Sequence, residues 1–171
     1  MPTNAEFKAR CEDLTAVRAR LDALGARFAG LDAQRDTYFR VPNGRLKLRE
    51  GTVETALIHY ERADVAGVKR SDVRLYAPAD APGLRAVLEA ALGILVVVEK
   101  QRAILFAGNV KIHLDSVPGL GTFVEVEAID TDGTIPLAAL HAQADAMRAA
   151  LGLAGAALEA RSYSDLLMER G

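Results

Sequence analysis

The 171-residue sequence has few features that would tie it to disulfide, membrane or zinc chemistry. It contains one cysteine, Cys11, which excludes an intrachain disulfide and a multi-cysteine metal site. None of the three histidines stands at a zinc-ligand spacing from another histidine or from the cysteine. No apolar run approaches the length that spans a bilayer, and the N-terminal residues lack the apolar core of a signal peptide. We therefore expect a cytoplasmic protein that does not bind a membrane.

A strong excess of one charge is also missing. The formal net charge is −2, whereas a general nucleic-acid binder would show a basic excess, so no nucleic-acid partner is expected. The sequence contains neither a phosphate-binding P-loop nor a serine–histidine hydrolase motif, which argues against catalysis of those kinds. The length and the ordinary globular composition fit a single domain over residues 1–171.

What the sequence does contain is charge on every second residue of several strand-like segments. The charged members are Glu6, Lys8 and Arg10, then Arg45, Lys47 and Arg49, then Lys111, His113 and Asp115, and finally Glu125 and Glu127. Successive side chains of a strand point to opposite faces, so each segment has one charged and one apolar face. Because the charged faces mix cations with carboxylates, they suggest an interior that holds a polyanion and a metal.

Turn and cap signals divide the chain into about eight strands and three or four helices. Asp13 is a helix N-cap, Gly25 a helix stop, and Pro42-Asn43-Gly44 a turn. The predicted strands are 3–11, 29–41, 44–50, 55–62, 68–77, 94–106, 109–117 and 120–130, and the predicted helices are 13–25, 81–92, 136–151 and 163–169. Short connections between strands require antiparallel neighbours.

Two architectures fit this pattern equally well. The helices must bury their apolar stripes, and the large apolar surface on offer is the uncharged face of the strands. If the sheet closes into a barrel, the charged faces point inward; in an open sheet they point into water. The helix at 136–151 suits either the barrel wall or a homodimer contact.

Six motifs taken in order resemble the CYTH superfamily, which includes class IV adenylate cyclases and thiamine triphosphatases. The motifs are Asn4-Ala-Glu6-Phe-Lys8-Ala-Arg10, Asp36-Thr-Tyr-Phe39, Gly44-Arg-Leu-Lys-Leu-Arg49, Ile112-His-Leu-Asp115, Phe123-Val-Glu125-Val-Glu127 and Ser162-Tyr-Ser-Asp-Leu-Leu167. The resemblance implies an α+β fold, a closed antiparallel eight-stranded β-barrel (the triphosphate tunnel) with helices packed outside, and so favours closure. The family signature ExExK falls on Asn4, Glu6 and Lys8, so an amide replaces the first carboxylate.

The charged residues suit a triphosphate substrate and a divalent metal. Arginine offers a bidentate fork to phosphate oxygens and lysine a point charge. The expected triphosphate ligands are Lys8, Arg10, Arg45, Lys47, Arg49, Arg62, Lys69, Lys100, Arg102, Lys111 and His113, with Lys8, Arg49 and Arg102 expected to be catalytic. Carboxylates suit Mg²⁺ or Mn²⁺, and the expected metal ligands are Glu6, Asp115, Glu125 and Glu127.

The resemblance favours a metal-dependent enzyme that is most like a class IV adenylate cyclase, which converts ATP to cyclic AMP and pyrophosphate. A triphosphatase acting on tripolyphosphate or thiamine triphosphate would use nearly the same residues. A third reading is a non-catalytic module that binds polyphosphate or a nucleotide. Asn4 favours this last reading, because the loss of a carboxylate weakens a metal site.

Overall fold

The computed structural model describes residues 3–62 and 67–171, apart from the side chain of Arg62. The elements are β1 (Thr3–Arg10), α1 (Leu14–Ala23), β2 (Arg27–Phe39), β3 (Arg45–Gly51), β4 (Thr55–Arg62), β5 (Lys69–Tyr76), α2 (Ala81–Leu92), β6 (Ile94–Ala107), β7 (Val110–Val117), β8 (Gly121–Asp130), α3 (Leu137–Ala150) and α4 (Tyr163–Arg170). Each predicted helix and strand is present, with its ends within two residues of the prediction.

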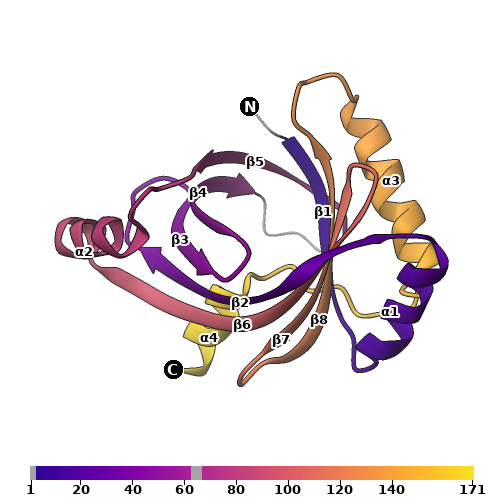
Figure 1. Ribbon diagram of the computed structural model, residues 1–171, viewed down its shortest axis with the longest axis horizontal. Helices are drawn as coiled ribbons and strands as arrows, with labels where there is room; N and C mark the ends of the chain where they lie inside the picture. Colours follow the sequence, from indigo (N-terminus) through magenta and orange to yellow (C-terminus); the bar gives the residue numbers. More distant parts are fainter. Residues whose placement is uncertain (1–2, 63–66) are drawn as a thin grey trace.

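The eight strands form a closed antiparallel barrel in the order β1-β5-β4-β3-β2-β6-β7-β8, and β8 pairs with β1 (Figure 1). The sheet is therefore closed, which confirms the predicted barrel and excludes the open sheet. Closure also leaves these strands without the unpaired edges that invite aggregation. The predicted turn at Pro42-Asn43-Gly44 joins β2 to β3. Gly44 has φ +62°, and a Cβ there would lie 2.7 Å from the carbonyl oxygen of Tyr60, so the turn requires glycine.

Three helices cover the outside of the barrel. In Figure 1, α1 and α3 lie on the side of β1 and β8, and α2 lies at the opposite end of the molecule. Leu21 of α1 and Leu140 and Ala144 of α3 are buried in one cluster with Ala5 and Phe7 of β1. Burial of these apolar faces drives the helices onto the barrel wall. The helix at 136–151 makes the predicted contact with the barrel wall.

The last helix, α4, begins at the cavity and packs against the barrel interior. Ser162 and Asp165 form a capping box that starts the helix, so its first residues are fixed in place. Tyr163 then packs edge-on against Phe123, with ring centroids 5.0 Å apart, in a buried cluster that includes Tyr60 and Val98. Val98 and Phe123 share the strand faces of Lys100 and Glu125, so these two faces of β6 and β8 are apolar next to Tyr163 and charged two residues further on.

The described helices include none with the length and apolarity needed to cross a membrane.

Candidate active site

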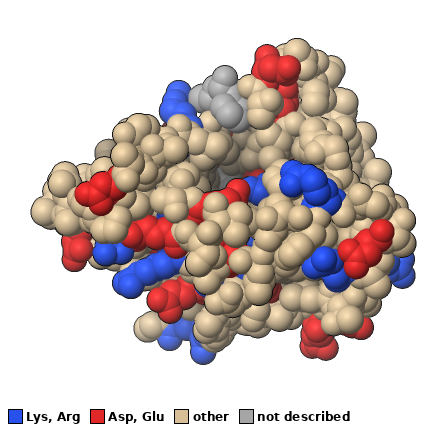
Figure 2. Space-filling model, viewed as in Figure 1, with Lys and Arg blue, Asp and Glu red and all other residues tan. Residues whose placement is uncertain are grey.

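The lumen contains a cavity of about 330 Å³, within the range of pockets that bind small molecules. Figure 2 shows a hollow in the molecular surface with acidic and basic side chains at its edge. Among the described residues, seven cations and four carboxylates line the cavity. The predicted site residues that line it are Glu6, Lys8, Lys47, Arg49, Lys69, Lys100, Arg102, Lys111, His113, Glu125 and Glu127.

Strand register explains why these residues meet. Glu125 of β8 lies directly opposite Lys8 of β1 on one side and His113 of β7 on the other. Glu127, two residues further along, lies opposite Glu6 and Lys111 in the same way. Alternation sends each of these side chains to the inner face, and antiparallel pairing places them side by side.

A buried carboxylate, Asp36 on β2, holds three of the lumen cations. Arg49 donates two hydrogen bonds to it, at 2.9 and 2.8 Å, and Lys100 donates one at 2.8 Å. The Lys47 ammonium lies 3.3 Å from the same carboxylate. Burial alone would raise the pKa of Asp36, but Arg49, Lys100 and Lys47 outweigh it and hold that pKa well below its usual range. Asp36 is therefore ionised and fixes the positions of the cations.

The pKa of Lys100, unlike that of Asp36, is shifted in the direction that burial favours. Burial lowers its pKa to about 7, and Arg49 and Arg102 add to that shift, although Asp36 opposes it. The Lys100 side chain thus has a substantial neutral fraction near neutral pH.

A second buried carboxylate, Asp115 on β7, holds Arg102. The guanidinium donates bidentate hydrogen bonds to Asp115 at 2.7 and 2.6 Å and a third bond to Glu125 at 3.0 Å. The Tyr163 hydroxyl donates to Asp115 at 2.7 Å. With both carboxylate oxygens occupied in this way, Asp115 orients Arg102 from behind the cavity wall.

The segment before α4 fixes two further lysines. Lys8 donates to the carbonyl oxygen of Arg161 at 2.8 Å, and Lys69 donates to that of Ala160 at 2.7 Å. Lys8 also lies 4.2 Å from the centroid of the Tyr163 ring, a cation–π contact. The C-terminal segment therefore orients cations that belong to β1 and β5.

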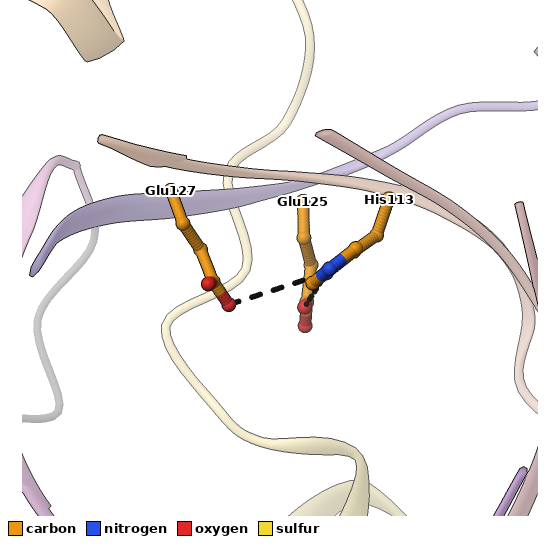
Figure 3. Close-up of side chains that lie close together, drawn as sticks. All are labelled: His113, Glu125 and Glu127. Atoms are coloured by element: carbon orange, nitrogen blue, oxygen red, sulfur yellow. Dashed lines mark hydrogen bonds and ion pairs between the residues drawn. The ribbon is translucent and has the colours of Figure 1, made fainter. Parts of the chain in front are cut away.

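His113 of β7 and Glu125 and Glu127 of β8 lie close together beside these cations and form the acidic group of the site. Figure 3 shows His113, Glu125 and Glu127 reaching in the same direction from adjacent strands, and one ligand atom from each lies within 4.8 Å of the others. Arg102 and the hydrogen bond from His113 overcome the effect of burial and hold the pKa of Glu125 well below its usual range. Burial, followed by the like charge of Glu6, raises the pKa of Glu127 to about 7.

These residues fit a divalent cation. Glu6, Glu125 and Glu127 supply the oxygen ligands that Mg²⁺ and Mn²⁺ prefer. Burial and Arg102 lower the pKa of His113 to about 4, so its imidazole is neutral and able to act as a ligand. Its buried Nε2 has no hydrogen-bond partner among the described residues. Burial and the neighbouring Glu6 carboxylate both raise the pKa of Glu127, and a bound cation would favour the ionised form of both groups.

Three of the predicted site residues whose side chains the structure describes, Arg10, Arg45 and Asp115, do not line the cavity. Arg10 is exposed and bonds the carbonyl oxygen of Leu120, and Arg45 makes bidentate hydrogen bonds to Asp165 at 2.7 and 2.9 Å. Asp115 lies behind Arg102. The side chain of Arg62 falls outside the described residues, although its backbone ends β4.

Three residues that sequence reasoning did not assign to the site take part in it: Asp36, Tyr163 and Glu54. Glu54 lines the cavity and pairs with Lys111, with 2.5 Å between carboxylate oxygen and ammonium nitrogen. It is held there because the Asp32 carboxylate accepts hydrogen bonds from the backbone of Val53 and Glu54. Glu54 follows a turn rather than alternating along a strand, so the charge pattern gave no signal for it. Asp36 and Tyr163 lie within family-like motifs, which was the available signal.

The fold and the cavity together define an antiparallel barrel with a charged interior and helices outside. Residues 3–163 match the family model described as the CYTH domain, and the chain therefore belongs to the CYTH domain family.

Individual relatives agree with this assignment. The chain is 29% identical over 167 residues to the adenylate cyclase CyaB of Aeromonas hydrophila, covering 94% of this chain and 86% of that one. The structure of the PH1012 protein from Pyrococcus horikoshii OT3 superposes with a TM-score of 0.82 at 23% identity, over 95% and 98% of the two chains. HpAC1 from Hippeastrum, an adenylyl cyclase candidate described with a dominant triphosphatase activity, has a TM-score of 0.62 at 14% identity, over 99% and 95%. These two structures share the fold with this chain.

Proposed function

We propose that this protein is a divalent-metal-dependent enzyme acting on a triphosphate, with ATP cyclisation to cyclic AMP and pyrophosphate as its reaction. The observation that carries the proposal is one cavity that, among the residues the structure describes, is lined by seven cations and by a smaller acidic group that fits a metal. A triphosphate carries several negative charges, and its reactions depend on positioning and on charge neutralisation. The relationship to CyaB supports the cyclase reaction.

The cations hold the phosphates in a fixed arrangement. Arg49 and Arg102 each donate a bidentate pair of hydrogen bonds to a buried carboxylate, so both guanidinium groups are oriented before any ligand arrives and their remaining N–H groups can meet phosphate oxygens. Lys8, which lies 3.7 Å from Glu125, stands between the cations and the acidic group. Preorganised charges of this kind stabilise a transition state without having to rearrange.

Glu6, Glu125 and Glu127, with His113 beside them, would hold the metal. When bound there, a divalent cation neutralises charge on the phosphate oxygens. The protein's contribution is the spacing of these ligands along β1, β7 and β8, which the barrel fixes.

In the cyclase reaction, the ribose 3′-hydroxyl attacks the α-phosphorus, the bond to the β-phosphate oxygen breaks, and pyrophosphate leaves. The hydroxyl proton needs an acceptor in a site crowded with cations. Lys100 suits this role, because burial lowers its pKa to about 7 and part of its population is neutral near that pH.

Hydrolysis of the terminal phosphate is the second candidate reaction. The description of HpAC1 favours it, since that barrel shares this fold and carries a dominant triphosphatase activity. Water would then attack the terminal phosphorus, and the same cations would hold the chain of phosphates.

Product analysis tests the proposal. The protein is incubated with ATP and either Mg²⁺ or Mn²⁺, and cyclic AMP, pyrophosphate, ADP and phosphate are resolved, with parallel reactions on tripolyphosphate and thiamine triphosphate. Cyclic AMP with an equal amount of pyrophosphate supports the cyclase, and phosphate release supports the triphosphatase. Tight triphosphate binding with no turnover under either metal would instead indicate the binding module.

A further inference from the structure

One carboxylate of the cavity wall lies among the cations and outside the acidic group. Glu54 lines the cavity, and its Oε2 accepts a hydrogen bond from the Lys111 ammonium at 2.5 Å. Burial alone would raise the pKa of Glu54, but Lys111 and then Arg49 outweigh burial and lower that pKa. Glu54 is therefore ionised, and its negative charge lies beside cations that are proposed to bind phosphate.

The turn between β3 and β4 fixes the backbone of Glu54. Asp32 of β2 is fully buried and accepts a hydrogen bond from the Thr52 hydroxyl at 3.2 Å. The same carboxylate accepts bonds from the backbone N–H groups of Val53 and Glu54 at 2.9 and 3.0 Å. Gly51 leaves room for this contact, since a Cβ there would lie 2.5 Å from an Asp32 oxygen. The turn is thus held from β2, and it keeps the Glu54 carboxylate within reach of Lys111.

The Glu54 carboxylate is held less firmly than the buried carboxylates that orient the arginines. Asp36 and Asp115 each accept a bidentate pair of hydrogen bonds from a guanidinium group. Glu54 accepts its bond from Lys111 on one oxygen, and its buried Oε1 has no hydrogen-bond partner among the described residues. Rotation of one side chain therefore releases the carboxylate from Lys111, while the backbone of the turn stays in place.

A phosphate oxygen and the Glu54 carboxylate compete for the same ammonium. Both are anionic hydrogen-bond acceptors, so a ligand that bonds Lys111 must first break the pair with Glu54. The ligand also brings its own negative charge close to a second anion, and like charges in a partly buried site repel each other. A polyphosphate that also bonds Arg49 and Arg102 offsets this cost with further contacts. A built-in repulsive group of this kind raises specificity by weakening the poorer ligands.

We infer that Glu54 is a specificity-determining residue, an anion built into the cavity that neutralises Lys111 in the free protein and gives way to a phosphate group of the ligand. Glu54 thereby lowers the affinity of the site for every phosphate ligand that reaches Lys111. A ligand that engages further cations then binds tightly in spite of it. The inference rests on the proposed function, because it requires phosphate groups to bind the lumen cations.

The test measures tripolyphosphate binding to the full chain by calorimetry at one ionic strength, with EDTA and with Mg²⁺. Glu54→Gln keeps the shape of the side chain and removes its charge, so this variant should bind tripolyphosphate about tenfold more tightly under both conditions. Glu50→Gln is the matched control. Glu50 lies on the same hairpin, pairs with Arg85 at 2.7 Å and is not among the described residues that line the cavity. The control makes the same change in net charge and should alter the dissociation constant by less than about threefold.

A double-mutant cycle links the effect to Lys111. Lys111→Gln alone should weaken tripolyphosphate binding, because it removes a cation from the site. Adding Glu54→Gln to Lys111→Gln should then change the dissociation constant by less than about threefold, because no ammonium remains for the two anions to compete for. A tenfold gain that persists without Lys111 would contradict the exchange at this lysine.

The inference is overturned if Glu54→Gln binds tripolyphosphate no more tightly than the wild-type protein. It is also overturned if Glu54→Gln binds more weakly in Mg²⁺ alone, since Glu54 would then be a metal ligand. Either result, obtained while the wild-type protein binds tripolyphosphate, leaves the proposed triphosphate site intact. If neither protein binds tripolyphosphate under either condition, the proposed function is overturned as well.

Discussion

Replacing Asp36 should lower the stability of the folded protein strongly. The change to asparagine keeps the shape of the side chain and removes its charge. Arg49, Lys100 and Lys47 would then be left around a neutral amide inside the barrel. Asp36 has no exposed surface, so water cannot replace the lost carboxylate at its own position.

The expected cost is large compared with the total stability. Removing one partner of a buried ion pair costs about 3–5 kcal/mol, because the remaining charge stays buried without compensation. A domain has about 5–15 kcal/mol of stability in all. For a chain of this length, about 2–4 °C of melting temperature corresponds to 1 kcal/mol, so we expect a fall of about 6–20 °C.

Urea and thermal unfolding of Asp36→Asn measure this loss. Asp72→Asn is the control, since its partner Arg70 is exposed and Asp72 is itself only partly buried, so their ion pair should contribute less than about 1 kcal/mol. Tripolyphosphate should restore part of the melting temperature of Asp36→Asn, because the polyanion supplies negative charge to the same cations. A loss below about 1 kcal/mol in Asp36→Asn would refute the view that this carboxylate compensates the cluster.

Three further predictions concern the acidic group and Lys100. Glu127→Gln should weaken Mn²⁺ binding at least about tenfold in calorimetry, because it removes a charged ligand, while the exposed Glu89→Gln should not. The pKa of His113 is lowered to about 4, so the folded state resists a proton that the unfolded chain binds below about pH 6.5. The contribution of His113 to stability should therefore fall as pH drops from 6.5 to 4, whereas Glu127, with its pKa raised to about 7, contributes in the opposite direction. His113→Asn should remove the His113 contribution from the slope in urea titrations; an unchanged slope would contradict the assignment. Lys100→Arg keeps the charge but cannot accept a proton, so kcat should fall about 10²-fold or more with little change in the tripolyphosphate Kd.

The strands and helices were predictable because local signals mark them. Asp13 and Gly25 bound α1 as an N-cap and a stop, and the turn at Gly44 separates β2 from β3. Closure of the barrel was not predictable from alternation. It depends on pairing between β1 and β8, strands from the two ends of the sheet, and the same alternation fits an open sheet with its charges in water. It was the resemblance to the CYTH superfamily that favoured the closed barrel over the open sheet.

Alternation also could not separate the members of one charged face. Arg45, Lys47 and Arg49 share a face of β3, yet Lys47 and Arg49 line the cavity and Arg45 does not. Arg45 stands at the start of the strand, where Asp165 of α4 binds its guanidinium. The position of α4 is a long-range property, so no pattern within β3 reveals it.

Asp36 shows most clearly what a charge pattern omits. Both faces of β2 carry polar residues. Leu31 is 61% exposed whereas Asp32 and Asp36 are buried, so hydrophobicity does not indicate which side chains of this strand are buried. The role of Asp36 comes from Arg49 on β3 and Lys100 on β6, the strands on either side of β2. One carboxylate does not neutralise the three cations around it. The fold therefore holds these cations in place without a ligand and still leaves positive charge for a polyanion to compensate.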